Sequence, residues 1–160
     1  MRSLALDIGE KRVGVAVSDR SGRIATPVTV LAADQLGPAG GLRRILDDYE
    51  PDTFVIGLPI SLDGSEGPQA ASVRAIAEEL RERFALPVEY VDERLTSVEV
   101  SRAMREAGLS EREQRGKRDA VAAALMLQTW LDARFAAGGF EHQSRDGTPS
   151  GLDVGEDIGG

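Results

Sequence analysis

Three carboxylates stand where the sequence pattern places the ends of secondary-structure elements. Asp7 closes the apolar run Leu-Ala-Leu and comes directly before Ile-Gly. Glu93 follows a predicted strand, and Asp119 falls in the first turn of the last predicted helix. An ionised carboxylate beside buried aliphatic residues is costly unless a cation or several donors meet it. We therefore expect Asp7 to have a positively charged partner.

The expected partner is a divalent metal ion. The helix that carries Asp119 has an apolar face from Ala123 to Trp130, and packing of this face on a sheet would carry Asp119 towards the other two acids. Three converging carboxylates cannot all stay ionised in a partly buried pocket without a cation. Oxygen ligands select hard metals, so Mg²⁺ or Mn²⁺ is the natural ion.

Each acid also has an ordinary structural explanation. Asp7 could accept backbone N–H groups in the turn that follows it, and Glu93 could form an exposed ion pair with Arg94. Asp119 could simply complement the positive end of a helix dipole. Only the combination of the three favours a metal site. Catalysis by histidine is not expected, because the single His142 lies in the C-terminal tail.

A loop rich in glycine and proline follows the fourth predicted strand. Residues 56–69 read IGLPISLDGSEGPQ, and loops that leave the carboxyl ends of strands are where α/β sheets bind ligands. Ser61, Ser65, Gln69 and backbone N–H groups could hold a phosphate there, with the N-terminus of the next helix adding its dipole. A plain surface connection with a turn at Asp63-Gly64 is the alternative.

Basic residues flank the acids and complete a candidate nucleic-acid surface. Lysine and arginine are common on solvated faces, so each is a weak signal alone. We predict contacts with nucleic acid from both the loop and these basic positions: Lys11, Arg12, Pro59, Ser61, Asp63, Gly64, Ser65, Arg94, Thr96 and Lys117.

The elements that must position these residues follow from periodicity and turn signals. The sequence predicts strands over 3–8, 12–18, 23–31, 53–58 and 87–92, and helices over 39–49, 68–84, 97–107 and 117–136. Pro27 favours an edge position for the third strand, and Ser110 with Glu113 forms a second capping box after that at Thr96. The order predicts an α/β fold: a mixed sheet of three antiparallel and two parallel strands flanked by helices, with the strands of Asp7 and Asp92 as possible neighbours.

Composition indicates one domain and a tail. The 160 residues include no cysteine, and the N-terminus lacks the pattern of a signal peptide, so a cytoplasmic protein without a membrane span is expected. The net charge is −8, and about half of it lies from residue 138 onward. We predict a folded domain over 1–137 and a disordered, acidic, glycine-rich tail over 138–160. The acidic balance weakens a nucleic-acid function without excluding it.

Four motifs, in order along residues 1–135, resemble those of the bacterial YqgF/RuvX family. They are Asp7-Ile-Gly-Glu-Lys-Arg-Val-Gly-Val-Ala, Gly57-Leu-Pro with Asp63-Gly-Ser-Glu-Gly, Asp92-Glu-Arg-Leu-Thr-Ser, and Gly116-Lys-Arg-Asp-Ala. The family comprises small ribonuclease-H-like proteins, described as Holliday-junction resolvases and as nucleases that mature the 5′ end of pre-16S rRNA. One departure is Ser61, where the family loop usually has asparagine.

The resemblance implies a metal-dependent endonuclease of ribosome biogenesis. Asp7, Glu93 and Asp119 would be its catalytic acids and would hold two Mg²⁺ or Mn²⁺ ions. One ion would activate a water for in-line attack on a phosphodiester, and the other would stabilise the leaving 3′-oxygen. The expected partner is structured RNA or branched DNA, and the expected state is a monomer or a weak homodimer.

Three alternatives stay open at this point. Resolution of four-way DNA junctions would normally use a symmetric dimer, which RNA processing does not need. A non-catalytic factor that binds nucleic acid would retain the fold without turnover. An Asp-x-Gly turn also begins the actin-like sugar and acetate kinases, but these need a second domain for which this chain has no repeat.

Overall fold

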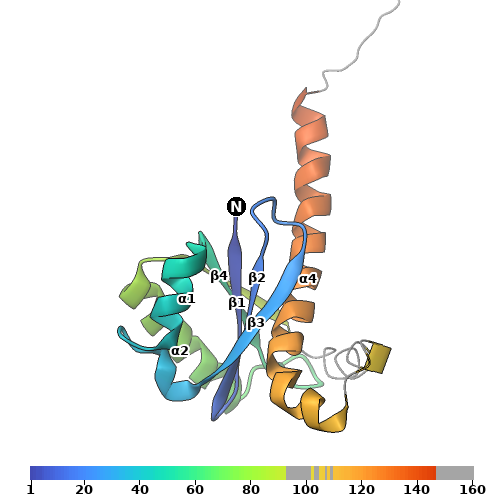
Figure 1. Ribbon diagram of the computed structural model, residues 1–160. Coiled ribbons are helices and arrows are strands. Elements are labelled where there is room, and N and C mark those ends of the chain that lie inside the picture. The colour runs from blue at the N-terminus through green and yellow to red at the C-terminus, as the bar shows by residue number, and fades with distance from the viewer. Residues whose placement is uncertain (93–101, 103–104, 107, 109, 147–160) are drawn as a thin grey trace, which may run out of the picture.

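The structure, a computed structural model, describes residues 1–92, 102, 105–106, 108 and 110–146. Its strands form one mixed sheet in the order β3-β2-β1-β4-β5. The strands are β1 (Ser3–Ile8), β2 (Arg12–Ser18), β3 (Ala25–Ala32), β4 (Thr53–Leu58) and β5 (Val88–Asp92). The helices are η1 (Ala33–Leu36, a 3-10 helix), α1 (Gly41–Tyr49), α2 (Pro68–Phe84) and α4 (Glu111–Asp146). Figure 1 shows α1 and α2 on one face of the sheet and α4 on the other.

The predicted meander and parallel pair are confirmed. β2 pairs antiparallel with both β1 and β3, whereas β4 pairs parallel with β1 and with β5. β3 lies at the sheet edge, as Pro27 predicts. The pairing of β2 with β3 shifts register between Val15 and Ala16, which pair with Thr29 and Pro27. A bulge therefore accommodates the proline.

The strands of Asp7 and Asp92 are not neighbours, contrary to the expectation from the sequence, because β4 lies between them. Every residue of β4 is buried, whereas β5 is half-exposed along its length. A strand whose two faces are both covered by helices is typical of the inside of a sheet, and β4 accordingly lies between β1 and β5. The parallel pairing still brings the carboxyl ends of β1, β4 and β5 to one edge, at the lower end of the sheet in Figure 1.

Alternation along the strands separates two cores. Leu4, Leu6 and Ile8 of β1 join the core against α1 and α2, whereas Ala5 joins the core against α4. The side chains on the α4 face of the sheet are small, and α4 packs small residues, Ala123 and Ala124, against them. Small side chains on both sides let α4 lie close to the strands.

The predicted boundaries hold well in the first half of the chain. α2 begins and ends where the sequence predicts, and α1 begins two residues later than expected, at Gly41. The predicted helix over 97–107 lies largely outside the described residues, although Arg102, Arg105 and Glu106 are helical. Gly108, the predicted end of that helix, has a left-handed φ of 77°, which is typical of a helix-ending glycine.

α4 is longer than predicted at both ends. The capping box at Ser110 forms, because Ser110 N–H donates to Glu113 Oε1 at 3.0 Å and Glu113 N–H donates to Ser110 Oγ at 3.2 Å. The helix then runs from Glu111 to Asp146, so the end expected near residue 136 is wrong and the helix enters the segment predicted as a tail. Paired glycines at 138–139 weaken a helix by about 1 kcal/mol each and mimic a stop signal. Residues 147–160 of the tail lie outside the described residues.

Across the described ranges, none of the helices is long and apolar enough to span a bilayer.

Candidate active site

The side chains of β1 alternate between the two faces of the sheet, and this alternation determines on which face Asp7 lies. Leu6 and Ile8 are committed to the core beneath α1 and α2, and Ala5 to the core beneath α4. Successive side chains of a strand point to opposite faces, so Asp7 lies on the α4 face together with Ala5. The side chain is half-buried. The carboxylate at the end of β1 therefore faces the helix that carries Asp119.

Gly14 links these two acids through the backbone. Asp7 pairs with Gly14 across the β1–β2 ladder, and a Cβ built on Gly14 would lie 1.8 Å from the carbonyl oxygen of Asp119 and 2.9 Å from the amide nitrogen of Ala120. Real Cβ atoms never approach a backbone oxygen so closely, so only glycine fits here. The close approach places the Asp119 segment of α4 directly over the β2 residue that neighbours Asp7.

The longer α4 removes the ordinary explanation for Asp119. With Glu111 as the first helical residue, Asp119 is not in the first turn, where the sequence pattern places it, but in the third. The favourable interaction of a carboxylate with the helix dipole falls off within the first turn. Asp119 is half-buried, and its position against Gly14 explains its placement better than the helix end does.

A cation already accompanies Asp119. Arg12 Nε lies 3.3 Å from Asp119 Oδ2, with 67% of the arginine side chain and 34% of the aspartate side chain exposed. Exposed ion pairs contribute only about 0–1 kcal/mol. Arg12 and Asp119 line an open hollow of ≈ 580 Å³ together with the turn residues Gly9, Glu10 and Lys11. The hollow thus opens beside Asp119 and is lined by charged groups of both signs.

The predicted phosphate loop lies at the same edge of the sheet. Leu58 ends β4 beside the end of β1, and the loop over 59–67 folds back on itself through an isolated bridge between Ile60 and Glu66. Ser61 N–H donates to the Ser65 carbonyl at 2.9 Å. Gly64 has a left-handed φ of 88°, so the Asp63-Gly64 turn of the structural alternative is present.

Asp63 stabilises this turn and engages one of the predicted phosphate ligands. Its Oδ1 accepts the Ser65 hydroxyl at 2.6 Å and the Ser65 amide at 2.9 Å. These two hydrogen bonds hold the pKa of the Asp63 carboxyl below its usual value. Asp63 is therefore a negatively charged organiser of the loop, and any contact that it makes with a phosphate needs an intervening cation or water.

The remaining predicted residues divide into placed and undescribed ones. Lys11 and Lys117 are exposed at this edge, one in the β1–β2 turn and the other two residues before Asp119. Glu93, Arg94 and Thr96 lie outside the described residues. Asp7 and Asp119 are thus brought to one face, while the expected third acid stays a prediction.

The described part of the chain contains no group of three histidine, cysteine, aspartate or glutamate side chains placed to hold a metal. Two of the three expected ligands, Asp7 and Asp119, are half-buried carboxylates on one face of the sheet. Such oxygen donors suit Mg²⁺ and Mn²⁺ and not softer metals. The residues present fit a hard divalent ion.

Gly14 is the site residue that sequence reasoning missed. Its signal was available, since a glycine inside a strand of buried valines marks a close approach of another backbone. The alanine-rich face of the last helix indicates that close packing, but not the strand that receives it.

Solved structures with this fold define the class. The T. thermophilus RuvC bound to a Holliday junction substrate matches with a TM-score of 0.52 at 14% identity, covering 84% of this chain and 96% of that one. The yeast mitochondrial Holliday junction resolvase Ydc2 matches with a TM-score of 0.50 at 9% identity, covering 88% and 81%. The chain thus has the ribonuclease-H-like fold of these resolvases.

Sequence relatives narrow the class to a family. Residues 1–133 match the family model described as "RuvX: Holliday junction resolvase". A protein of Anaeromyxobacter sp. (strain K) named "Putative pre-16S rRNA nuclease" is 44% identical over 135 residues, covering 84% of this chain and 98% of the relative. A protein of Thermosynechococcus vestitus with the same name is 42% identical over 132 residues, covering 82% and 87%. The chain belongs to the RuvX family.

Proposed function

We propose that this protein is a divalent-metal-dependent endonuclease that hydrolyses phosphodiester bonds in the 5′ leader of pre-16S rRNA. One observation carries the proposal. Gly14 admits the backbone of Asp119 onto the strand position that pairs with Asp7, so that carboxylates from two distant segments share one face at the carboxyl end of β1. The names of the relatives supply the substrate.

In this proposal Asp7, Asp119 and Glu93 hold Mg²⁺ or Mn²⁺. Bound there, the metal ions would supply an activated water and stabilise the charge on the leaving oxygen. The chain itself holds the substrate. Lys11, Arg12 and Lys117 would meet phosphate oxygens at the rim, and Arg12, which pairs with Asp119 at 3.3 Å, is placed to contact a phosphate beside that acid.

The loop over 59–67 guides the strand past the carboxylates. It is held in shape by Asp63, and its Ser61 and Ser65 backbone groups lie at the edge where β1 and β4 end. A pre-rRNA substrate favours a cytoplasmic protein, and the proposed chemistry needs only one protomer.

Resolution of DNA junctions is the second candidate function. The description of the matched family and the fold shared with the RuvC–junction complex favour it. A junction is cut symmetrically by two active sites, so this function requires a dimer.

One experiment separates the two functions. The protein and its Asp7→Asn variant are incubated in Mn²⁺ with a labelled RNA carrying the small-subunit rRNA leader and, separately, with a labelled four-way DNA junction. We expect cleavage of the RNA by the wild type alone. Preference for the junction would establish the second function, and binding without cleavage of either substrate would show a non-catalytic factor.

A further inference from the structure

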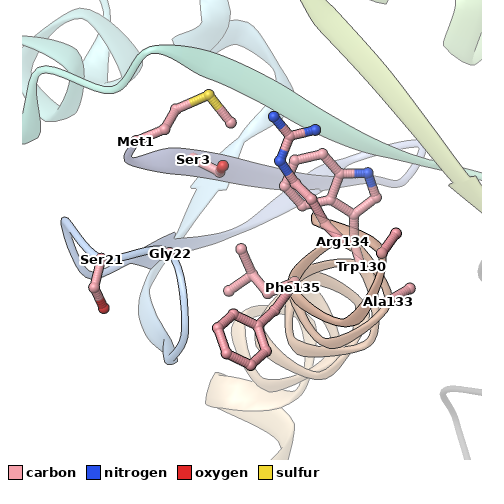
Figure 2. Close-up of a pocket in the computed structure, with 10 residues that line it drawn as sticks. Met1, Ser3, Ser21, Gly22, Trp130, Ala133, Arg134 and Phe135 are labelled. Carbon is pink, nitrogen blue, oxygen red and sulfur yellow. The ribbon is translucent and has the colours of Figure 1, made fainter. Parts of the chain in front are cut away.

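A second concave region lies at the opposite end of the sheet from Asp7. It is a cleft of ≈ 630 Å³ between the start of β1, the turn that joins β2 to β3, and α4. Figure 2 shows Ser3 of β1 and Gly22 of the turn on one side, with Trp130, Arg134 and Phe135 of α4 on the other. The carboxylate site uses none of these residues.

The α4 wall of this cleft carries two aromatic rings, and a guanidinium group lies over each of them, one from α4 and one from the turn between β2 and β3. The Arg134 guanidinium carbon lies 5.2 Å from the centre of the Trp130 ring, and that of Arg23 lies 4.2 Å from the centre of the Phe135 ring. Phe135 is 51% exposed. Aromatic platforms flanked by arginine suit nucleobases and phosphates of a single strand, because bases stack on the rings while the cations meet the backbone.

The acids near the cleft are engaged by other groups. Asp19 Oδ1 accepts the amides of Arg23 and Ile24, and its Oδ2 accepts the Ser21 hydroxyl. Asp132 accepts the side-chain amide of Gln128 at 2.9 Å. The guanidinium groups of Arg23 and Arg134 therefore take no part in these hydrogen bonds.

Ser3 adds an unusual polar group to the cleft. Its side chain is fully buried, and within the described chain its Oγ is the buried side-chain atom without a hydrogen-bond partner. Buried hydroxyls are nearly always paired, so one that lines a cleft marks a place where a bound group could pair with it.

The cleft and the proposed active site lie at two positions along α4. Asp119 and Trp130 are eleven residues apart, which is three turns of the helix. The separation along the axis is about 16 Å at 1.5 Å per residue. A base-stacked strand that rises about 3.4 Å per nucleotide along its axis would span this separation with about five nucleotides.

We propose that this cleft binds the single-stranded part of the nucleic-acid substrate about five nucleotides from the cleaved bond. Bases stack on Trp130 and Phe135, and Arg134 and Arg23 contact phosphates. The inference rests on the proposed nuclease function and deepens it by adding a contact that positions the strand along α4.

Trp130 is the single tryptophan of the chain, so its fluorescence reports on this cleft alone. The full-length Asp7→Asn protein is titrated with an oligouridylate of about eight nucleotides, and anisotropy of the same labelled RNA gives the affinity independently. Arg134→Ala and Phe135→Ala are made in this background. The matched control is Arg43→Ala, which removes an arginine stacked at 5.3 Å on Phe84, on the other face of the sheet.

We expect saturable quenching of Trp130 and affinities lowered about tenfold by Arg134→Ala and by Phe135→Ala, with Arg43→Ala unchanged. Equal affinities in all variants, or an emission that RNA does not alter, would overturn the inference. An emission that instead depends on protein concentration, or on deletion of residues 147–160, would assign the cleft to a second copy or to the tail. Cleavage by the wild type is measured separately, so intact cleavage with unaltered KM in both cleft variants defeats this inference alone.

Discussion

The carbonyl oxygen of Asp119 lies where a Cβ on Gly14 would be, with only 1.8 Å between the two positions. This contact joins the third turn of α4 to the middle of β2. Because Gly14 also pairs with Asp7, one glycine sets how closely the two carboxylate-bearing segments approach. The geometry of the site therefore depends on a residue that carries no functional group.

Gly14→Ala is expected to damage stability and activity together. The added methyl group forces α4 away from β2, and overpacking of this kind costs about 1–3 kcal/mol in the free energy of unfolding. Chemical denaturation and RNA cleavage measure the two effects. Gly116→Ala is the control on the same helix, because no described atom lies within 4 Å of the place that its new methyl group would take; it should gain up to about 1 kcal/mol. Equal behaviour of the two variants contradicts the role of Gly14.

Arg12→Ala is expected to weaken substrate binding without unfolding the protein. Its ion pair with Asp119 is exposed, so the free energy of unfolding should change by less than about 1 kcal/mol. KM for RNA should rise several-fold, because a phosphate contact is lost. Steady-state kinetics checks this against Arg81→Ala, which breaks an exposed pair with Glu78 on α2. If both variants have the KM of the wild type, Arg12 does not contact substrate.

Asp19 is expected to titrate at unusually low pH. Hydrogen bonds from the Ser21 hydroxyl, and then from the Arg23 and Ile24 amides, lower its pKa from 3.8 to about 2. Since the folded pKa is the lower one, this carboxyl stabilises the fold above pH 3.8 and loses that contribution as the pH falls towards 2. Carboxyl-carbon NMR gives the pKa directly.

Ser21→Ala should raise the pKa of Asp19 towards 3.8, because the largest of its stabilising hydrogen bonds is removed. Ser72→Ala, at an exposed position on α2, is the control and should leave the pKa of Asp19 unchanged. A pKa near 3.8 in the unmodified protein would show that the turn between β2 and β3 is not held as described.

Gln128→Ala is expected to loosen that turn from α4. The Gln128 side chain accepts the Ala25 amide at 2.9 Å and donates to the Arg23 carbonyl at 2.7 Å. Loss of two such bonds, one to a partly buried amide, should lower the free energy of unfolding by about 1–3 kcal/mol. Thermal denaturation tests this beside Thr129→Ala, which removes only a bond to the carbonyl of the preceding turn and should change little. If Gln128→Ala and Thr129→Ala lower the free energy of unfolding by the same small amount, Gln128 does not hold the turn to α4.

Local patterns predicted the elements of this fold and which strands run parallel or antiparallel, but they did not predict the position of β4 in the sheet. Apolar runs and turn signals defined β1, β2 and β4 to the residue, and an apolar helix face defined α2. The position of β4 between β1 and β5 depends on which strand is buried on both faces, and single strands carry that information only weakly. The paired glycines at 138–139 resembled a helix end, although the helix continues through them.

The sequence predicted two parts of the candidate site, Asp7 near the end of β1 and Asp119 on the apolar face of α4. The apolar face of α4 correctly indicated that Asp119 turns towards the sheet. The start of α4 at Glu111 was not predicted, and it puts Asp119 in the third turn of the helix and not in the first. This start depends on the capping box at Ser110, and the sequence did not show that the helix begins at this box. The glycine at position 14 indicated a close approach of another backbone, but only the structure shows that this backbone is that of Asp119. The role of Glu93 stays a prediction.

The central claim is that Asp7 and Asp119 act together through a divalent metal, and the most direct test is single-turnover cleavage of the leader RNA. Wild type, Asp7→Asn, Asp119→Asn and the exposed control Asp34→Asn on η1 are compared in Mn²⁺, in chelator, and after Mn²⁺ is restored. Cleavage should occur in wild type and Asp34→Asn, stop in chelator, return with Mn²⁺, and be lost in both site variants. Cleavage that persists in chelator, or in Asp7→Asn, would contradict the account.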